Sequence, residues 1–410
     1  MFRIWIYLSI KNFLKSFFLK NTSLKKKFVE KYICKQSKKK YSHLFSQCRV
    51  AFYFILIYLK KKRNKNEIIL CAYNLPEMIN VAKNLGLKIK YYDLDYKTGS
   101  PIIKDIKKKI SKKTLAVVLT NMFNTYRDAK KIKNILKKNK IPLIEDNAIY
   151  FDNYTLKNGK KYFSGSLGDF SIYSFNIMKN ISSFYGGAGS TNDMKFKKFC
   201  IEQEKNLDTF FIFPLLKQIT IFFILKTMSI KYLYKYIFSH IIAIAHKYKI
   251  SPLLFLFYPS LKNINLKLPK YFHTKISTFA IKNTYLQLKD EKKRRELFKS
   301  RKKLHKLYYE KLKNLNSPNF NTIKKFDYNY QNYLDFPVLV KDKQNLNSYL
   351  LKYDIEVRFK HYYNCAKIFK EKNIYKNAER YEKELICFPA HIKTKNSYID
   401  FIETKLRNYY

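Results

Sequence analysis

The sequence predicts an α/β large domain, a smaller α+β domain after it, and an apolar helical insertion between the two. The first half of the chain alternates short apolar runs of strand length with amphipathic helical segments. Such an alternation requires crossover connections and gives a mostly parallel sheet with helices on both faces. The second half begins with an intensely apolar stretch and ends in shorter alternating segments. A length of 410 residues also exceeds what one hydrophobic core usually supports.

The large domain follows from the order of these segments. Residues 49–59 show helical apolar repetition, and Gly86 ends a second helix. The expected strands are 67–73, 87–95, 115–123 and 141–148, and the further helices are 74–86, 102–111 and 127–140. Ligands bind beyond the carboxyl ends of the strands in such sheets, so we expect the functional site there.

The second half is expected to contain one or two long helices over 275–315, with a set of probable buried positions at Phe279, Leu286, Phe298, Leu304 and Tyr308. The small domain is then predicted as strand 333–340, helix 345–354, strand 355–363, helix 377–391 and a terminal helix. The predicted boundaries are a basic amphipathic segment at 1–44, the large domain at 45–206, the insertion at 207–262, and the linking helix with the small domain at 263–410.

Charge and cysteine content limit the function classes. The net charge is +53, but the lysines are spread along the whole chain and no nucleic-acid recognition motif occurs, so we expect no nucleic-acid partner. An anionic substrate or a membrane surface stays open. The six cysteines are far apart and form no CxxC pair, which disfavours a disulfide framework and a structural metal site and favours a reducing, cytoplasmic location.

Two apolar segments are candidates for membrane contact. The first 18 residues lack a small-residue cleavage site and are interpreted as a basic amphipathic helix and not a signal peptide. In residues 207–260, Lys or His interrupts the apolar run too often for a membrane span. Interfacial helices that meet anionic lipid fit this pattern, and so does a helical subdomain or a dimer contact.

One lysine is set apart by its neighbours. The chain has eight glycines, and six of them flank Lys179: Gly159, Gly165, Gly168, Gly186, Gly187 and Gly189. The strand end "LIEDNA" places Glu145 and Asp146 upstream of it, and we expect both carboxylates to converge with Ser174 and Lys179 at the same rim of the sheet. A lysine that forms a Schiff base and an aspartate that protonates a ring nitrogen are what pyridoxal phosphate (PLP) requires. From the residues alone, a surface lysine and an Asp146 that caps a helix or binds Mg²⁺ are equally open.

The motif "LIEDNA…GSLGDFSIYSFNIMKNISSFYGGAGSTND" resembles the DegT/DnrJ/EryC1/StrS family of PLP-dependent sugar aminotransferases, which have fold type I. The resemblance extends over about residues 45–205 and 270–400. It implies a three-layer large domain, a PLP cofactor and a homodimer with the site at the subunit interface.

The resemblance also implies roles for individual residues. Lys179 would form the Schiff base and shuttle a proton to and from the substrate carbon, and Asp146 would pair with the pyridine nitrogen. Ser174 and the backbone amides near Cys48 and Arg49 would bind the phosphate. The complete set of cofactor positions is Asp146, Ser174, Cys48, Arg49, Leu75, Ala148, Asn180 and His273.

Five residues depart from the family pattern. The family usually has Gly followed by Ser or Thr at Cys48 and Arg49, an aromatic residue at Leu75, Gln or His at Ile149, and an Asn supplied by the partner subunit at His273. The lysine and the acid of the chemistry are both retained. These departures leave altered substrate choice or reduced activity open.

The predicted function is transfer of an amino group from an amino acid, glutamate in the resembling family, to a keto group of a nucleotide-linked sugar for surface polysaccharide or amino-sugar biosynthesis. Arg358 and His361 are candidates for contacting the anionic substrate, or else surface residues of a small-domain strand. Dehydration is disfavoured because family members of that type replace the lysine with histidine. The alternative is a catalytically altered or inactive PLP-fold protein that acts at a membrane surface, at the inner face of the membrane.

Overall fold

The computed structural model describes residues 2–122, 126–149, 151–157, 160–252, 267–315, 317–323, 334–359 and 361–410. Several predicted features lie partly outside these residues: Phe123 and Tyr333 of two predicted strands, Lys360 of a third, Gly159, and residues 253–262 of the insertion.

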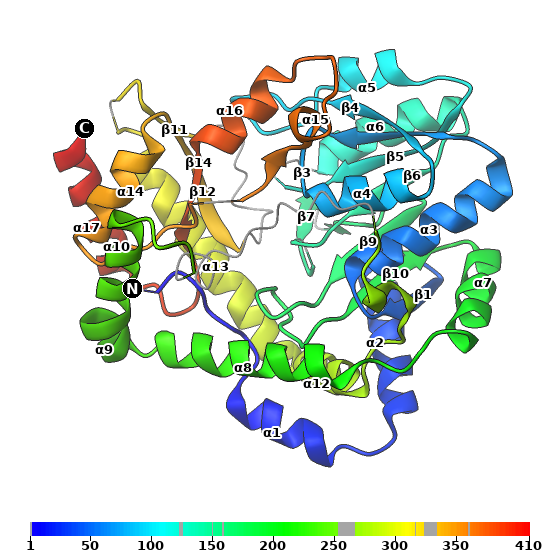
Figure 1. Ribbon diagram of the computed structural model, residues 1–410, viewed down its shortest axis with the longest axis horizontal. Coiled ribbons are helices and arrows are strands. Elements are labelled where there is room, and N and C mark those ends of the chain that lie inside the picture. The colour runs from blue at the N-terminus through cyan, green and yellow to red at the C-terminus, as the bar shows by residue number, and fades with distance from the viewer. Residues whose placement is uncertain are drawn as a thin grey trace.

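A twisted sheet forms the centre of the large domain (Figure 1). Within the described residues it has seven strands in the order β1-β10-β9-β6-β5-β2-β4. Their bounds are β1 (Tyr41–Phe45), β2 (Glu67–Cys71), β4 (Lys88–Tyr92), β5 (Thr114–Thr120), β6 (Leu143–Asp146), β9 (Phe170–Ser174) and β10 (Gly187–Thr191). The strands from β9 to β4 run parallel, whereas β10 and β1 are antiparallel to their neighbours. The prediction of a mostly parallel sheet is therefore confirmed.

Helices connect and cover these strands. They are α2 (Thr22–Ser37), α3 (Cys48–Arg63), α4 (Pro76–Asn84), α5 (Ile103–Lys109), α6 (Tyr126–Lys138) and α7 (Met194–Lys205). Each helix and strand predicted between residues 49 and 148 is present, with ends shifted by a few residues. All residues of β2, β5, β6 and β9 are buried, which explains why these strands are continuous apolar runs instead of alternating ones.

The small domain contains an antiparallel sheet of β11 (Phe320–Thr322), β12 (Asp335–Val340) and β14 (Leu385–Pro389). Helices α13 (Glu291–Leu312), α14 (Lys343–Leu351), α16 (Lys376–Glu384) and α17 (Asn396–Tyr409) pack around it, and α12 (Thr278–Lys289) leads into it. The five buried positions predicted for the long helices are all buried.

Two predictions for the small domain are wrong. The helix expected over 377–391 ends at Glu384, because the apolar run that follows it is the fully buried strand β14. The strand expected over 355–363 makes only a bridge between Arg358 and Cys387 in the small domain. It then crosses to the large domain, where β13 (Tyr363–Asn364) pairs with β3 (Tyr73–Asn74) and α15 (Cys365–Ile368) follows.

The first residues are extended and not helical as predicted. Phe2, Ile4, Ile6 and Leu8 are buried, so the apolar residues alternate with period two along the backbone, which is the strand periodicity. Helix α1 begins only at Ile10 and ends at Phe18, and the Ser9 hydroxyl caps it by accepting a hydrogen bond from the Asn12 amide at 3.1 Å.

The insertion folds back onto this extended segment. It contains α8 (Ile212–Met228), α9 (Lys231–Leu233), the π-helix η1 (Tyr234–Phe238) and α10 (Ser239–Lys247), and the 3₁₀ helix η2 (Lys270–His273) precedes α12. One apolar cluster joins the N-terminal residues to the insertion, including Ile6, Phe13, Phe222 and Ile242. A short hairpin of β7 (Tyr154–Lys157) and β8 (Lys160–Phe163) completes the large domain.

Among the described residues, no single helix has the length and apolarity to cross a membrane. The segments Ile212–Met228 and Lys231–Lys247 reach that length and composition only as a pair, and they are bent by 82° at the break between them.

Candidate active site

The connection between β9 and β10 carries Lys179 at the carboxyl end of β9. Gly186 has φ of +108°, a conformation that favours glycine, and a Cβ on Gly187 would lie 2.2 Å from the Cys48 amide nitrogen. These glycines therefore let the end of the lysine loop lie directly against the start of α3. The clustering of glycines around Lys179 has a structural cause: two backbones meet there at closer range than a side chain permits.

Lys179 is a half-buried lysine with a depressed pKa. Burial lowers the pKa of its amine from 10.5 to about 8, and the charges of Arg358 and Arg49 act in the same direction. The Asp146 carboxylate opposes this effect only in part. No hydrogen bond from the Lys179 amine to another described residue is present, so its nitrogen is available for chemistry.

Asp146 ends β6 beside the same loop. Burial raises the pKa of its carboxyl, while a hydrogen bond from the Ala148 amide to Oδ1 at 3.0 Å and the charge of Lys179 lower it. Because Lys179 and Asp146 each shift the pKa of the other, the structure brings the two predicted catalytic groups together.

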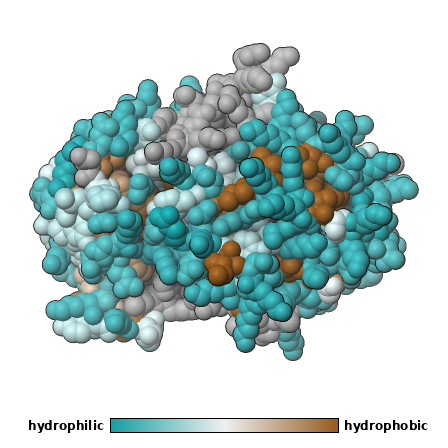
Figure 2. All heavy atoms as spheres, turned by 90° about the horizontal axis from the view of Figure 1, so that it is seen from above, coloured by the Kyte–Doolittle hydropathy of each residue, from teal (hydrophilic) through white to brown (hydrophobic). Residues whose placement is uncertain are grey.

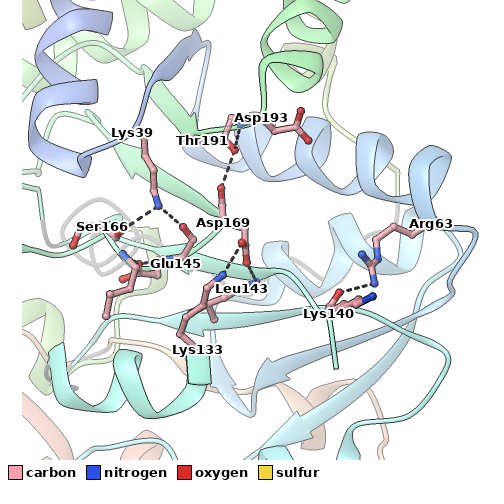
Figure 3. A network of polar contacts seen from close by, with 12 residues as sticks. Lys39, Arg63, Lys133, Lys140, Leu143, Glu145, Ser166, Asp169, Thr191 and Asp193 are labelled. Atoms are coloured by element: carbon pink, nitrogen blue, oxygen red, sulfur yellow. Dashed lines mark hydrogen bonds and ion pairs between the residues drawn. The ribbon is translucent and has the colours of Figure 1, made fainter. Parts of the chain in front are cut away.

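Glu145, the neighbouring acid, does not join them. Successive residues of a strand point to opposite faces, and the Glu145 carboxylate accepts hydrogen bonds from the amides of Gly165 at 3.0 Å, Leu167 at 2.9 Å, and Gly168. Figure 3 shows this carboxylate within the polar network around Lys39 and Asp169. The expectation that both carboxylates converge on one site is thus wrong for Glu145, which holds the 165–168 turn.

The N-terminus of α3 faces the site and can bind an anion. Its N-cap residue Gln47 makes no side-chain capping bond to the helix, so the first amides of α3 are not capped by a side chain. Arg49 is held there by Gln47 Oε1 at 2.7 Å and by Glu77, and its charge lowers the pKa of Lys179. Burial, followed by the Asp146 charge, raises the pKa of the Cys48 thiol, which therefore stays neutral.

Ser174 lies at the buried end of β9, opposite Gly187 in the antiparallel pair with β10. Its hydroxyl forms no hydrogen bond with another described residue. Ser174 thus adds a buried hydroxyl next to the close contact of Gly187 with α3, and its role as a phosphate ligand stays a prediction.

The small domain contributes one cation, Arg358, and one neutral imidazole, His361, to the site. Arg358 is fixed by an ion pair with Asp335 at 2.8 Å and lowers the pKa of Lys179. Burial lowers the pKa of His361, and Arg358 and Lys179 lower it further. Both predicted substrate residues thus lie near the lysine and not on a remote surface.

Tyr362 is a site residue that the sequence reasoning did not single out. Burial raises the pKa of its phenol, and the neighbouring Asp146 raises it further. Its amide donates to the Tyr73 hydroxyl at 3.2 Å, so it is fixed at the crossing between the domains. The aromatic run "HYY" in the predicted strand was the available signal, but it did not indicate which ring turns inward.

The remaining predicted residues occupy different places. The Asn180 side chain donates to the Phe151 carbonyl at 3.3 Å and accepts from Arg301, so it anchors the loop. Leu75 is half-buried just before α4, and Ala148 is half-buried beside Asp146. His273 is exposed at the end of η2, where the structure brings it into no contact with Lys179.

A hydrogen-bond network behind the loop was also not predicted. The Ser182 hydroxyl donates to the Lys179 carbonyl at 3.0 Å and accepts from the Tyr7 amide at 3.1 Å. Gln287 bonds both backbone groups of Ser182, at 3.0 and 2.6 Å. These partners lie more than 100 residues apart from the loop in sequence, so no local pattern indicates them.

Residues 2–122, 126–149 and the other described ranges contain no group of three or more His, Cys, Asp or Glu that could hold a metal ion. The six cysteines are free.

The site fits PLP in three respects: an amine with a pKa near 8, a buried acid within electrostatic reach of it, and an uncapped helix start with an adjacent hydroxyl. A lysine at the carboxyl edge of a mostly parallel sheet, with a small domain facing it, is the arrangement of fold type I PLP aminotransferases. Residues 7–206 match the DegT/DnrJ/EryC1/StrS aminotransferase family.

Relatives and solved structures agree with this placement. The chain is 28% identical over 178 residues to GDP-perosamine synthase of Escherichia coli O157:H7, covering 43% of this chain and 46% of that protein. It is 28% identical over 127 residues to GDP-perosamine synthase of Vibrio cholerae, covering 31% and 34%. The match therefore spans less than half the length of either curated relative.

Two aminotransferase structures are similar over nearly the whole chain. The putative sugar aminotransferase Spr1654 of Streptococcus pneumoniae in its PMP form has a TM-score of 0.69 at 14% identity, covering 100% of this chain and 98% of that one. Helicobacter pylori PseC, an aminotransferase of pseudoaminic acid biosynthesis, has a TM-score of 0.67 at 16% identity, covering 99% and 98%. At these identities the likeness establishes the fold, and the predicted PLP cofactor is confirmed for the family.

Proposed function

We propose that the protein is a PLP-dependent aminotransferase that moves an amino group from an amino acid, with glutamate as the expected donor, to a keto group of a nucleotide-linked sugar. The observation that carries the proposal is the pairing of Lys179, whose pKa is about 8, with the buried Asp146. When bound, PLP supplies a carbonyl carbon that takes up the amino group and a ring that accepts the electron pair of the substrate C–H bond.

The residues of this chain would hold the cofactor and move protons. Roughly a tenth of the Lys179 amine is neutral at pH 7 when its pKa is about 8, so it can act as nucleophile and as proton carrier at the substrate carbon. Asp146 would keep a proton on the ring nitrogen. The α3 amides, Ser174 and the Arg49 cation would bind the phosphate, with Arg49 compensating for the hydroxyl missing at this turn.

We propose the acceptor of the amino group from the small-domain side chains that lie near Lys179. Arg358 and His361 lie near Lys179, and Arg358 is held in place by Asp335. A guanidinium fixed in this way suits a diphosphate. The name of the E. coli relative makes a GDP-linked keto-sugar the first acceptor to test.

The test follows the two halves of the reaction separately. We expect purified protein with PLP to show an absorption band of the lysine-bound cofactor, glutamate to convert it to the amine form, and a GDP-linked keto-sugar to restore it. The Lys179→Ala variant should lack the band. A band that no amino donor changes would refute the aminotransferase proposal and support a non-catalytic protein of this fold.

We also propose that the protein forms a homodimer and works at the inner, cytoplasmic face of a membrane. The exposed His273, at the position that the family fills from the partner subunit, supports the first. The apolar residues that α8 to α10 leave exposed within the predicted contact region 207–260 support the second. Light scattering tests the dimer, and a mass equal to one chain would refute it.

A further inference from the structure

Helix α1 and the insertion carry a set of exposed apolar side chains, which together we call the helical face. On α1 it comprises Ile10, Leu14, Phe17 and Phe18, and on the insertion Ile212, Phe213, Leu216, Phe223, Ile224, Tyr232, Tyr236, Ile237, Ile244 and Tyr248. Figure 1 shows α1, α8 and α9 along the lower edge of the molecule. The edge on the other side, seen in Figure 2, is largely hydrophilic.

The two parts of this face are joined by packed rings. Phe13 of α1 is buried and lies with its ring centroid 5.2 Å from that of Phe17 and 5.4 Å from that of Phe223. Phe17 and Phe223 are both exposed on their outer sides. Because one buried ring supports both exposed rings, residues 200 apart in sequence form a single surface. The N-terminal helix thus belongs to the same surface as the insertion.

The charges around the helical face have one sign. Residues 2–29 and 209–252 contain no Asp or Glu. The exposed lysines along these segments are Lys11, Lys15, Lys20, Lys27, Lys217, Lys231, Lys235, Lys247 and Lys249. Three of them lie over tyrosine rings of the face: Lys231 over Tyr232, Lys235 over Tyr236 and Lys247 over Tyr248, at 5.8, 5.0 and 5.2 Å.

We propose that the helical face docks on an anionic lipid surface. Apolar side chains would enter the boundary between headgroups and acyl chains, tyrosines would lie at headgroup level, and the lysines would meet lipid phosphates. A second copy of the chain is the rival occupant. A two-fold contact places the same surface on both subunits, so it would bring lysines against lysines with no acid of either segment to neutralise them. The charge pattern therefore favours lipid.

The test uses full-length protein and vesicles of phosphatidylcholine, with and without about one third phosphatidylglycerol. We expect flotation with the anionic vesicles, at least about tenfold weaker binding to neutral ones, and release at high salt. The double variant Phe18→Glu with Phe213→Glu should reduce anionic binding by about tenfold or more. These side chains are 84% and 80% exposed, so the fold should tolerate both changes.

The matched control is Ile374→Glu. Ile374 is 77% exposed but lies between α15 and α16 and outside the helical face, so its variant should bind vesicles like the wild type. Equal flotation of all three proteins would overturn the proposal. So would a double variant that turns a dimer into a monomer without changing flotation, because the face would then be a subunit contact. Neither outcome depends on aminotransferase activity.

Discussion

Lys39 and Lys179 are both withdrawn from water in the large domain, but they have opposite surroundings. The Lys39 amine donates to the carbonyls of Ser166 at 3.1 Å and Gly168 at 2.5 Å, at the network of Figure 3. Burial lowers its pKa, and the nearby Glu145 and Asp169 counteract this. At Lys179 the charge of Arg358 is the strongest, ahead of the opposing charge of Asp146, and no described residue accepts a hydrogen bond from the Lys179 amine.

Lys39 and Lys179 lie at opposite ends of the parallel strands. Lys39 lines a cavity of about 740 Å³ beside the starts of β6 and β9, and neither Lys179 nor Asp146 lines it. Lys179 lies at the carboxyl ends of the same strands. Burial alone therefore does not make a lysine reactive. A buried amine whose charge is satisfied by acceptors stabilises the fold, whereas one that faces cations gives up its proton more easily.

The largest expected effect is the loss of activity in Lys179→Ala. Without its amine the site lacks both the nucleophile and the proton carrier, so we expect turnover to fall by at least about a thousandfold. The thermal unfolding temperature should change little, because the Lys179 amine forms no hydrogen bond with a described residue that the variant would lose. Turnover within tenfold of the wild type would contradict the assignment of Lys179.

The comparison predicts the reverse for Lys39→Met. Two carbonyls and the neighbouring acids would lose their cation, so we expect the free energy of unfolding in urea to fall by about 1–3 kcal/mol. Activity per folded molecule should remain. The exposed neighbour Lys40 provides the control, since Lys40→Met should change stability by no more than about 0.5 kcal/mol. A Lys39 variant as stable as the control would remove the contrast between the two lysines.

The sequence was sufficient for the parts of the site that lie on consecutive strand ends. Asp146 and Lys179 could be paired because apolar runs mark β6 and β9, and parallel strands end at one edge. The prediction for Glu145 was wrong because an apolar run does not indicate toward which face of the sheet each side chain points. That choice depends on the turn at 165–168, which needs an acceptor for its amides.

Long-range packing accounts for the other failures. Residues 2–8 alternate between apolar and other side chains, but the lysines that follow them indicate a helix. The apolar side chains of residues 2–8 are buried against the insertion and the small domain, which no local pattern indicates. Arg3, for example, forms a buried ion pair with Glu356 at 3.0 Å. The small-domain segment 355–363 likewise leaves its sheet because its end pairs with β3 of the other domain.

A smaller effect is expected from Arg358→Gln. Arg358 lowers the pKa of Lys179, so its removal should raise that pKa. The neutral amine appears as pH rises through the pKa, and the pH midpoint for PLP attachment to the lysine should therefore move upward from about 8 by roughly half to one unit. Absorption measured from pH 6 to about 10 reports this midpoint without any sugar substrate. Arg295→Gln, at an exposed helix pair, should leave it unchanged, and a downward shift for Arg358→Gln would contradict the electrostatic argument.

The smallest effect is expected from Ser182→Ala, which separates holding Lys179 in place from tuning its charge. The variant loses the bond from the Ser182 hydroxyl to the Lys179 carbonyl and leaves the Tyr7 amide without its acceptor. We expect PLP affinity to fall by about fivefold, the equivalent of roughly 1 kcal/mol, with the pH midpoint unchanged. Ser183→Ala is the matched control, because Ser183 donates to the Ala280 carbonyl and does not touch the lysine. Ser182→Thr should restore the affinity, and a midpoint that moves in Ser182→Ala would show that position and charge are not separable in this loop.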